Sequence, residues 1–172
     1  LLAPLIGGQA FSLVQAAEIS LTAASSSVGV GQRIEVVVWL DASGDDINAI
    51  EGKVFFPPAS LELQEIKDGP SIINLWVKQP KLGADRAIHY LGLIPGGYVE
   101  RHGRLFTMIF QAKEVGLAEL LVSQTKILLN DGQGTPAPVT FKNLTLKLVP
   151  VGLIPTNHEP LGNGQILDLD SP

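Results

Sequence analysis

The chain has 172 residues, of which 45% are hydrophobic and 17% are charged. Its 12 Lys and Arg against 17 Asp and Glu give a formal net charge of −5, which excludes a nucleic-acid binder that relies on a basic surface. The apolar fraction is enough for one buried core and one globular domain. The chain has no Cys, which excludes disulfides and cysteine-ligated metal sites.

The two ends of the chain differ in composition from the middle. Residues 1–16 carry no charge and end in small residues, which is typical of a signal peptide and its cleavage site. We therefore expect part of a signal peptide over residues 1–16, with an apolar first strand as the alternative, and a domain over residues 17–149. Residues 150–172 are rich in Pro and Gly and are expected to form a linker or tail. Export would make the protein secreted or attached to the cell surface, with any membrane or cell-wall tether outside this sequence.

Between the ends, apolar residues recur with a period near two, and turn residues interrupt them about every 8 to 15 positions. In chain order, the expected strands span residues 18–23, 33–41, 47–56, 61–66, 72–77, 87–94, 104–113, 117–129 and 139–149. The strand over 117–129 is long enough to need a bulge or bend. The pattern predicts an all-β fold, a nine-stranded jelly-roll β-sandwich.

For two of these strands, the sequence also predicts where the side chains point. Trp39 lies in the most apolar strand and is expected in the core. Along residues 47–56, successive side chains point to opposite faces of the sheet. One row consists of Ile50, Gly52, Val54 and Phe56, and the other of Ala49, Glu51, Lys53 and Phe55.

The sequence contains no pattern that is typical of a catalytic or metal site. The three histidines, His89, His102 and His158, do not have the spacing of a metal site. There is also no Gly-rich phosphate loop followed by a capped helix and no nucleophile elbow. We therefore expect a protein that is not an enzyme and that needs no metal or cofactor.

Aromatic residues suggest a different kind of site. Sugar-binding modules of sandwich fold stack exposed rings on pyranose faces. Trp76 and Tyr98 lie in irregular segments and are candidates for such rings, which makes polysaccharide a candidate ligand.

Several local motifs, taken in order, resemble the cohesin domain, the receptor module that captures dockerin modules. The resemblance spans residues 18–149. The motifs are Val28-Gly29-Val30-Gly31-Gln32, Ile47-Asn48-Ala49-Ile50-Glu51-Gly52, Phe56-Pro57-Pro58, Leu61-Glu62-Leu63, Ile88-His89-Tyr90-Leu91-Gly92, Gly103-Arg104-Leu105-Phe106 with Phe110, and Asn130-Asp131-Gly132. The family fold is a nine-stranded jelly-roll sandwich, in agreement with the strand pattern.

The resemblance also implies where a partner would bind. In cohesins, one sheet face receives the dockerin helices, and here it would be built by residues 47–56, 72–77, 87–94 and 117–129. The family's typical Asn-x-Asp pair falls on Ala49 and Glu51. The carboxylate is therefore retained as a Glu, whereas the amide is replaced by a methyl group. The resemblance implies partner-binding roles for Ala49, Glu51, Lys53, Phe55, His89, Leu91, Leu93, Glu119, Leu121 and Ser123.

These observations lead to one principal hypothesis: an exported, non-catalytic module that resembles a cohesin and holds a dockerin-like partner on one sheet face. Its context would be a polysaccharide-degrading or cell-surface assembly. Two alternatives stay open, a carbohydrate-binding module on the same sandwich and a structural spacer domain of a surface protein.

Overall fold

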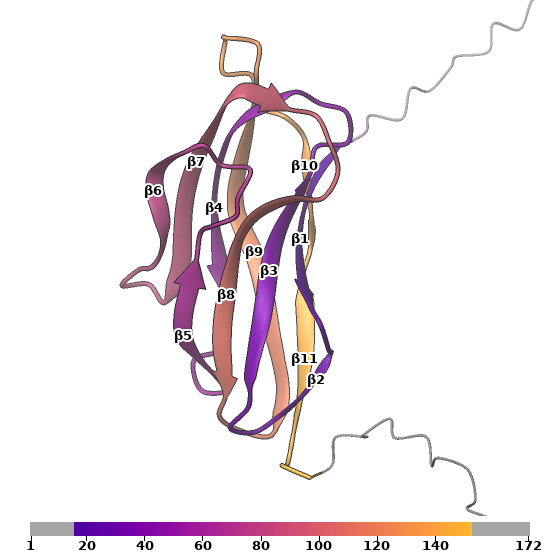
Figure 1. Ribbon diagram of the computed structural model, residues 1–172, viewed down its shortest axis with the longest axis vertical. Coiled ribbons are helices and arrows are strands. Elements are labelled where there is room, and N and C mark those ends of the chain that lie inside the picture. Colours follow the sequence, from indigo (N-terminus) through magenta and orange to yellow (C-terminus); the bar gives the residue numbers. More distant parts are fainter. Residues whose placement is uncertain (1–15, 153–172) are drawn as a thin grey trace, which may run out of the picture.

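The computed structural model describes residues 16–152, which form two β-sheets packed face to face (Figure 1). The strands are β1 (Ala17–Ala23), β2 (Ser27–Gly29), β3 (Arg33–Asp41), β4 (Ile47–Phe55), β5 (Leu61–Lys67), β6 (Leu75–Leu82), β7 (Ala87–Tyr98), β8 (Gly103–Ala112), β9 (Gly116–Leu129), β10 (Val139–Lys142) and β11 (Leu144–Val149). The predicted all-β sandwich is confirmed, with eleven strands in place of nine. The described residues include no helix that could cross a membrane.

The strands divide into two sheets. The first sheet has the order β10-β1-β3-β8-β5, and the second has the order β2-β11-β9-β4-β7-β6. Neighbouring strands are antiparallel, except that β1 pairs with β10 and β11 pairs with β2 in parallel. The four segments expected to build the binding face are therefore consecutive neighbours in the second sheet, in the order β9-β4-β7-β6.

The two additional strands have local causes. The short strand β2 pairs with the end of β11. The predicted strand over residues 139–149 is divided at Asn143, where the chain leaves β1 in the first sheet and joins β9 in the second. The Asn143 side chain accepts a hydrogen bond from the Val122 backbone N–H at 3.0 Å, so the amide satisfies a backbone donor at the crossing.

Strand β6 runs from Leu75 to Leu82, whereas the expected strand covered residues 72–77. Strand β6 lies at the edge of its sheet, where a strand can be largely polar. Its lysines are exposed, so the usual alternation of apolar and polar residues is weak there. Strand β7 continues to Tyr98, whereas the expected strand ended at residue 94. Gly96 and Gly97 have φ of 94° and 81° there, and the pairing with β4 shifts register between Ile47 and Ala49.

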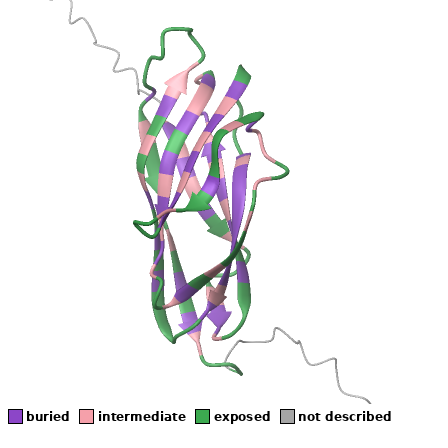
Figure 2. Cartoon of the chain, turned by 90° about the vertical axis from the view of Figure 1, so that its left-hand side faces the viewer, coloured by how far each residue is buried: buried purple, intermediate pink, exposed green. Residues whose placement is uncertain are grey.

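The core lies between the two sheets, and buried residues alternate with less buried ones along the strands (Figure 2). Aromatic rings link the sheets. The Phe106 ring of β8 has its centroid 5.1 Å from that of Tyr90 and 6.4 Å from that of Trp76, which both belong to the second sheet. These contacts form part of the hydrophobic core that joins the two sheets.

The core prediction for Trp39 is wrong. In β3, the alternation buries Val36, Val38 and Leu40, so the intervening Trp39 points to the outer surface of the first sheet and is half-buried. The same row holds Arg33, Glu35 and Asp41, so the alternation of the strand, unlike its overall apolar character, indicates an outward Trp39. The predicted signal peptide, except for residue 16, and residues 153–172 of the predicted tail lie outside the described part of the chain.

Candidate partner-binding face

The outward surface of β9, β4 and β7, which we name the β4 face, brings together the predicted partner-binding residues. On one side of β4, Ala49 pairs with Leu93, Glu51 with Leu91, and Lys53 with His89. On the other side, Lys53 pairs with Ser123 and Phe55 with Leu121. Glu119 follows the same alternation in β9 and pairs with Thr145 of β11, at the margin of the face. All ten predicted residues thus share one side of one sheet, whereas their role in binding stays a prediction.

An apolar hollow occupies part of the β4 face. Its volume is about 180 Å³, and its apolar lining includes Ala49, Leu91, Leu93 and Leu128. Glu51 and Lys126 also line the hollow, and both are exposed. An apolar centre with charges at its rim is the composition of a protein-binding site.

Sequence reasoning missed two residues of this hollow, Lys126 and Leu128. The cause is a bulge in β9, because Glu51 pairs with Lys126 whereas Lys53, two residues later, pairs with Ser123. Gln124 has φ of 49° at this point. The extra residue changes which positions face outward, from 119, 121 and 123 before the bulge to 126 and 128 after it. The sequence predicted a bulge in this strand without its position.

Electrostatic contacts are concentrated at one end of the β4 face. The Asp85 carboxylate accepts a hydrogen bond from Lys53 Nζ at 3.1 Å and lies 2.7 Å from His89 Nε2. The hydrogen bond with His89, followed by that with Lys53, holds the pKa of the Asp85 carboxyl well below its usual range. At the hollow, by contrast, Glu51 and Lys126 take part in no ion pair within residues 16–152. Their charges are therefore available to a partner.

The rings proposed for sugar stacking are not exposed. Trp76 and Tyr98 are both half-buried and packed against the core. The Tyr98 hydroxyl donates a hydrogen bond to the Arg101 carbonyl at 3.1 Å. These two residues therefore do not form a stacking platform. Among residues 16–152, no three His, Cys, Asp or Glu side chains are grouped so that they could hold a metal ion.

Comparisons with known proteins relate this fold to one group of structures. No sequence profile of a protein family matches the chain, and no curated protein matches it by sequence. A non-cellulosomal cohesin from the hyperthermophilic archaeon Archaeoglobus fulgidus is similar in structure, with a TM-score of 0.62 and 23% sequence identity over 78% of this chain and 91% of that one.

Two bacterial structures give the same result. The seventh ScaB type I cohesin from Pseudobacteroides cellulosolvens has a TM-score of 0.63 and 17% identity over 87% of this chain and 98% of that one. The sixth cohesin of Acetivibrio cellulolyticus scaffoldin B, solved in complex with a Cel5 dockerin mutant, has a TM-score of 0.61 and 19% identity over 78% and 99%. At these identities the similarity concerns the fold, and the chain has the fold of a cohesin module.

Proposed function

We propose that this chain is a non-catalytic binding module that captures a dockerin-like partner on the β4 face. The observation that supports the proposal is the apolar hollow with its unpaired rim charges, located on the strands β9, β4 and β7 of a cohesin-like fold. The Acetivibrio cellulolyticus cohesin that is similar in structure was solved with a dockerin, which favours this class of partner.

In the hollow, the apolar residues would provide most of the affinity, and the charged residues at the rim would provide most of the specificity. An apolar side chain of the partner would be removed from water against Leu91, Leu93 and Leu128, which favours binding by about 25 cal/mol per Å² before the costs of association. Glu51 and Lys126 would select the charges of the partner and speed its approach. Ala49 keeps the hollow open because its side chain is short.

The proposal includes a location and a context. The uncharged residues 1–16 favour export, so the module would act on the cell surface or in the medium, in a polysaccharide-degrading or surface assembly. Residues 150–172 would connect it to a larger assembly. If the chain bound polysaccharide and no dockerin, a carbohydrate-binding module would be the better description, and if it bound neither, a structural spacer would be.

The direct test measures binding to purified dockerin modules from the source genome by biolayer interferometry, with wild-type protein and a Leu91→Glu variant. We expect the variant to weaken binding by ~30-fold or more, because a charge in a desolvated hot spot costs at least about 2 kcal/mol. Val115→Glu is the matched control, since Val115 is 61% exposed and lies in the turn between β8 and β9, outside the β4 face.

A second variant guards against misfolding. Ala49→Arg fills the hollow without removing a buried group, and it should weaken binding as Leu91→Glu does. Thermal unfolding of each variant would establish that the fold is intact. Wild-type binding of a dockerin by folded Leu91→Glu and Ala49→Arg proteins would exclude the β4 face as the binding site.

A further inference from the structure

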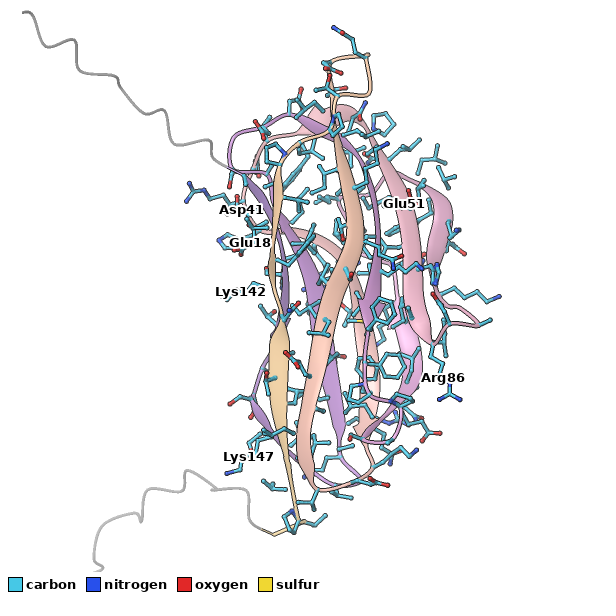
Figure 3. All side chains as sticks on the ribbon, turned by 180° about the vertical axis from the view of Figure 1, so that it is seen from behind. Glu18, Asp41, Glu51, Arg86, Lys142 and Lys147 are labelled. Carbon is cyan, nitrogen blue, oxygen red and sulfur yellow. The ribbon has the colours of Figure 1, made fainter. Side chains whose placement is uncertain are left out.

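A second hollow lies on the other side of the molecule, on the outer surface of the first sheet. Its volume is about 330 Å³, and it is lined by Glu18, Ser20, Thr22, Trp39, Leu40, Asp41, His102 and Lys142. Figure 3 shows Glu18, Asp41 and Lys142 along one side of the molecule, away from Glu51 of the β4 face. The register explains the grouping, because Ser20 pairs with Trp39 and with Lys142, and Glu18 pairs with Asp41.

Trp39 has a fixed orientation in this hollow. Its indole N–H donates a hydrogen bond to the Thr22 hydroxyl at 2.8 Å. The Arg104 guanidinium carbon lies 5.3 Å from the centroid of the ring, within the range of a cation–π contact. Arg104 covers one face of the ring, so a ligand would stack on the other. Because these two contacts hold the indole in place, binding would not have to immobilise it.

Polar groups next to the ring are free to bind a ligand. Within residues 16–152, the side chains of Glu18, Ser20 and Lys142 form no hydrogen bond and no ion pair. They provide a carboxylate acceptor, a hydroxyl that can donate or accept, and an ammonium donor. Asp41 is less available, because its carboxylate accepts a hydrogen bond from the Ser43 N–H at 2.8 Å.

We propose that this hollow binds a neutral oligosaccharide. A pyranose ring has apolar C–H faces and a rim of hydroxyls, which match an aromatic face surrounded by acceptors and donors. The carboxylates of Glu18 and Asp41 are accompanied by Lys142 and Arg104, so the charges of the site do not favour a polyanion or a polycation. One sugar stacks on Trp39, and its hydroxyls bond to Glu18, Ser20 and Lys142.

This site is independent of the proposed dockerin capture. The two hollows share no lining residue and belong to different sheets. A single module could therefore hold a protein on one sheet and a polysaccharide on the other. A failure of either activity leaves the other measurable in the same protein.

The two tryptophans of the chain allow a specific fluorescence test. Trp76→Phe leaves Trp39 as the sole tryptophan, so its emission reports on this hollow alone. We expect cellohexaose, xylohexaose, mannohexaose or chitohexaose to shift that emission in a saturable way. In the same background, Glu18→Gln and Lys142→Gln should each weaken binding ~5-fold or more, since each removes a charge-assisted hydrogen bond. Glu119→Gln, an exposed acid of the second sheet, is the matched control.

Three outcomes would overturn the proposal. The first is an unchanged Trp39 emission with all four sugars up to ~10 mM, where a site with a Kd of ~1 mM is filled. The second is a response to an acidic oligogalacturonate that exceeds the response to every neutral sugar. The third is equal binding by Glu18→Gln, Lys142→Gln and the control. If Trp76→Phe does not fold, the same titrations followed by the indole N–H resonance of Trp39 in the wild-type protein decide among these outcomes.

Discussion

The outer surfaces of the two sheets contrast in how they are built. On the β4 face, short and branched apolar side chains around Ala49 leave a hollow with charges at its rim. On the first sheet, the hollow is built around one large ring, Trp39, which Thr22 and Arg104 hold in place. In both cases the hollow is formed by side chains that point outward from strands whose inward side chains form the core. Packing of the core therefore does not fix which residues stand at these outward positions. One sandwich can therefore present two surfaces of different chemistry.

The largest expected effect on stability concerns Gly52, whose residue position faces the core beneath the β4 face. Gly52 pairs with Tyr90, and an added Cβ would approach the Tyr90 hydroxyl oxygen to 2.5 Å and Thr125 Oγ1 to 2.7 Å. Gly52→Ala should lower the free energy of unfolding by about 1–3 kcal/mol, because the site is already filled. Urea unfolding measures this change.

Tyr90→Phe provides the control for that variant. The Tyr90 hydroxyl is buried without a hydrogen-bond partner, and burial raises the pKa of this side chain well above its usual range. Its removal should change the free energy of unfolding by less than ~1 kcal/mol. In the double variant, Tyr90→Phe should recover part of the Gly52→Ala loss. Equal stability of Gly52→Ala and wild-type protein would show that the sheet adapts freely under the β4 face.

A smaller effect is expected at the bulge of β9. The first sheet also shifts register at its hollow, between Val38 and Trp39. Gln124 has φ of 49°, a conformation that a β-branched residue adopts with strain. Gln124→Val should therefore destabilise the domain by about 1–2 kcal/mol, whereas Gln124→Gly should be neutral or slightly stabilising. Chemical unfolding of the two variants side by side makes the comparison. A Val variant as stable as the Gly variant would contradict a left-handed residue at this position.

The bulge also shows where sequence reasoning succeeded and where it stopped. Strict alternation placed Ala49, Leu91 and Leu121 on one surface, because a strand has a period of two and its inner row must be apolar. The same rule failed for Lys126 and Leu128, because one extra residue in β9 reverses the alternation beyond it. Nothing in the run from residue 117 to 129 distinguishes a bulge at Gln124 from one at a neighbouring residue.

Trp39 illustrates a second limit. In β3, the inner row of Ile34, Val36, Val38 and Leu40 is apolar throughout, whereas the row of Trp39 also holds Arg33, Glu35 and Asp41. Strict alternation therefore indicates an outward Trp39, and the core prediction is wrong because it followed the overall apolar character of the strand. Cross-strand pairing with Ser20 and Arg104 brings further polar neighbours to the side of Trp39. The limit concerns the partners of Trp39. Its contacts with Thr22 and Arg104 join strands that are far apart in the sequence, and β3 alone does not predict them.

The rim of the β4 face gives a prediction about rates. Glu51→Gln should lower the association rate with a dockerin several-fold and reduce its dependence on salt, because exposed charges of an interface act mainly by steering. Glu35→Gln is the matched control on the outer surface of the first sheet, where Glu35 lies 3.6 Å from Lys67. Stopped-flow measurements at two salt concentrations separate the variants. The same rate change in both would mean that net charge, and not the rim of the hollow, steers the partner.

The smallest expected effect concerns the stability contributed by Asp85, whose carboxylate contacts Lys53 and His89 of the β4 face. His89 and Lys53 lower the pKa of the Asp85 carboxyl, so the folded state binds a proton at Asp85 less readily than the unfolded chain does. The resulting stabilisation is present above the ordinary carboxyl pKa of about 4 and is lost as the pH falls below it. Asp85→Asn should therefore lower the melting temperature slightly at neutral pH, and the difference from wild type should shrink between pH ~5 and pH ~2. Salt should reduce this difference as well, because Asp85 is exposed.

Asp45→Asn is the control, since the Asp45 side chain forms no hydrogen bond or ion pair within residues 16–152. A difference for Asp85→Asn that stays constant across this pH range would mean that its charge contributes nothing, and that the Asp85 contacts order the end of the β4 face through geometry alone.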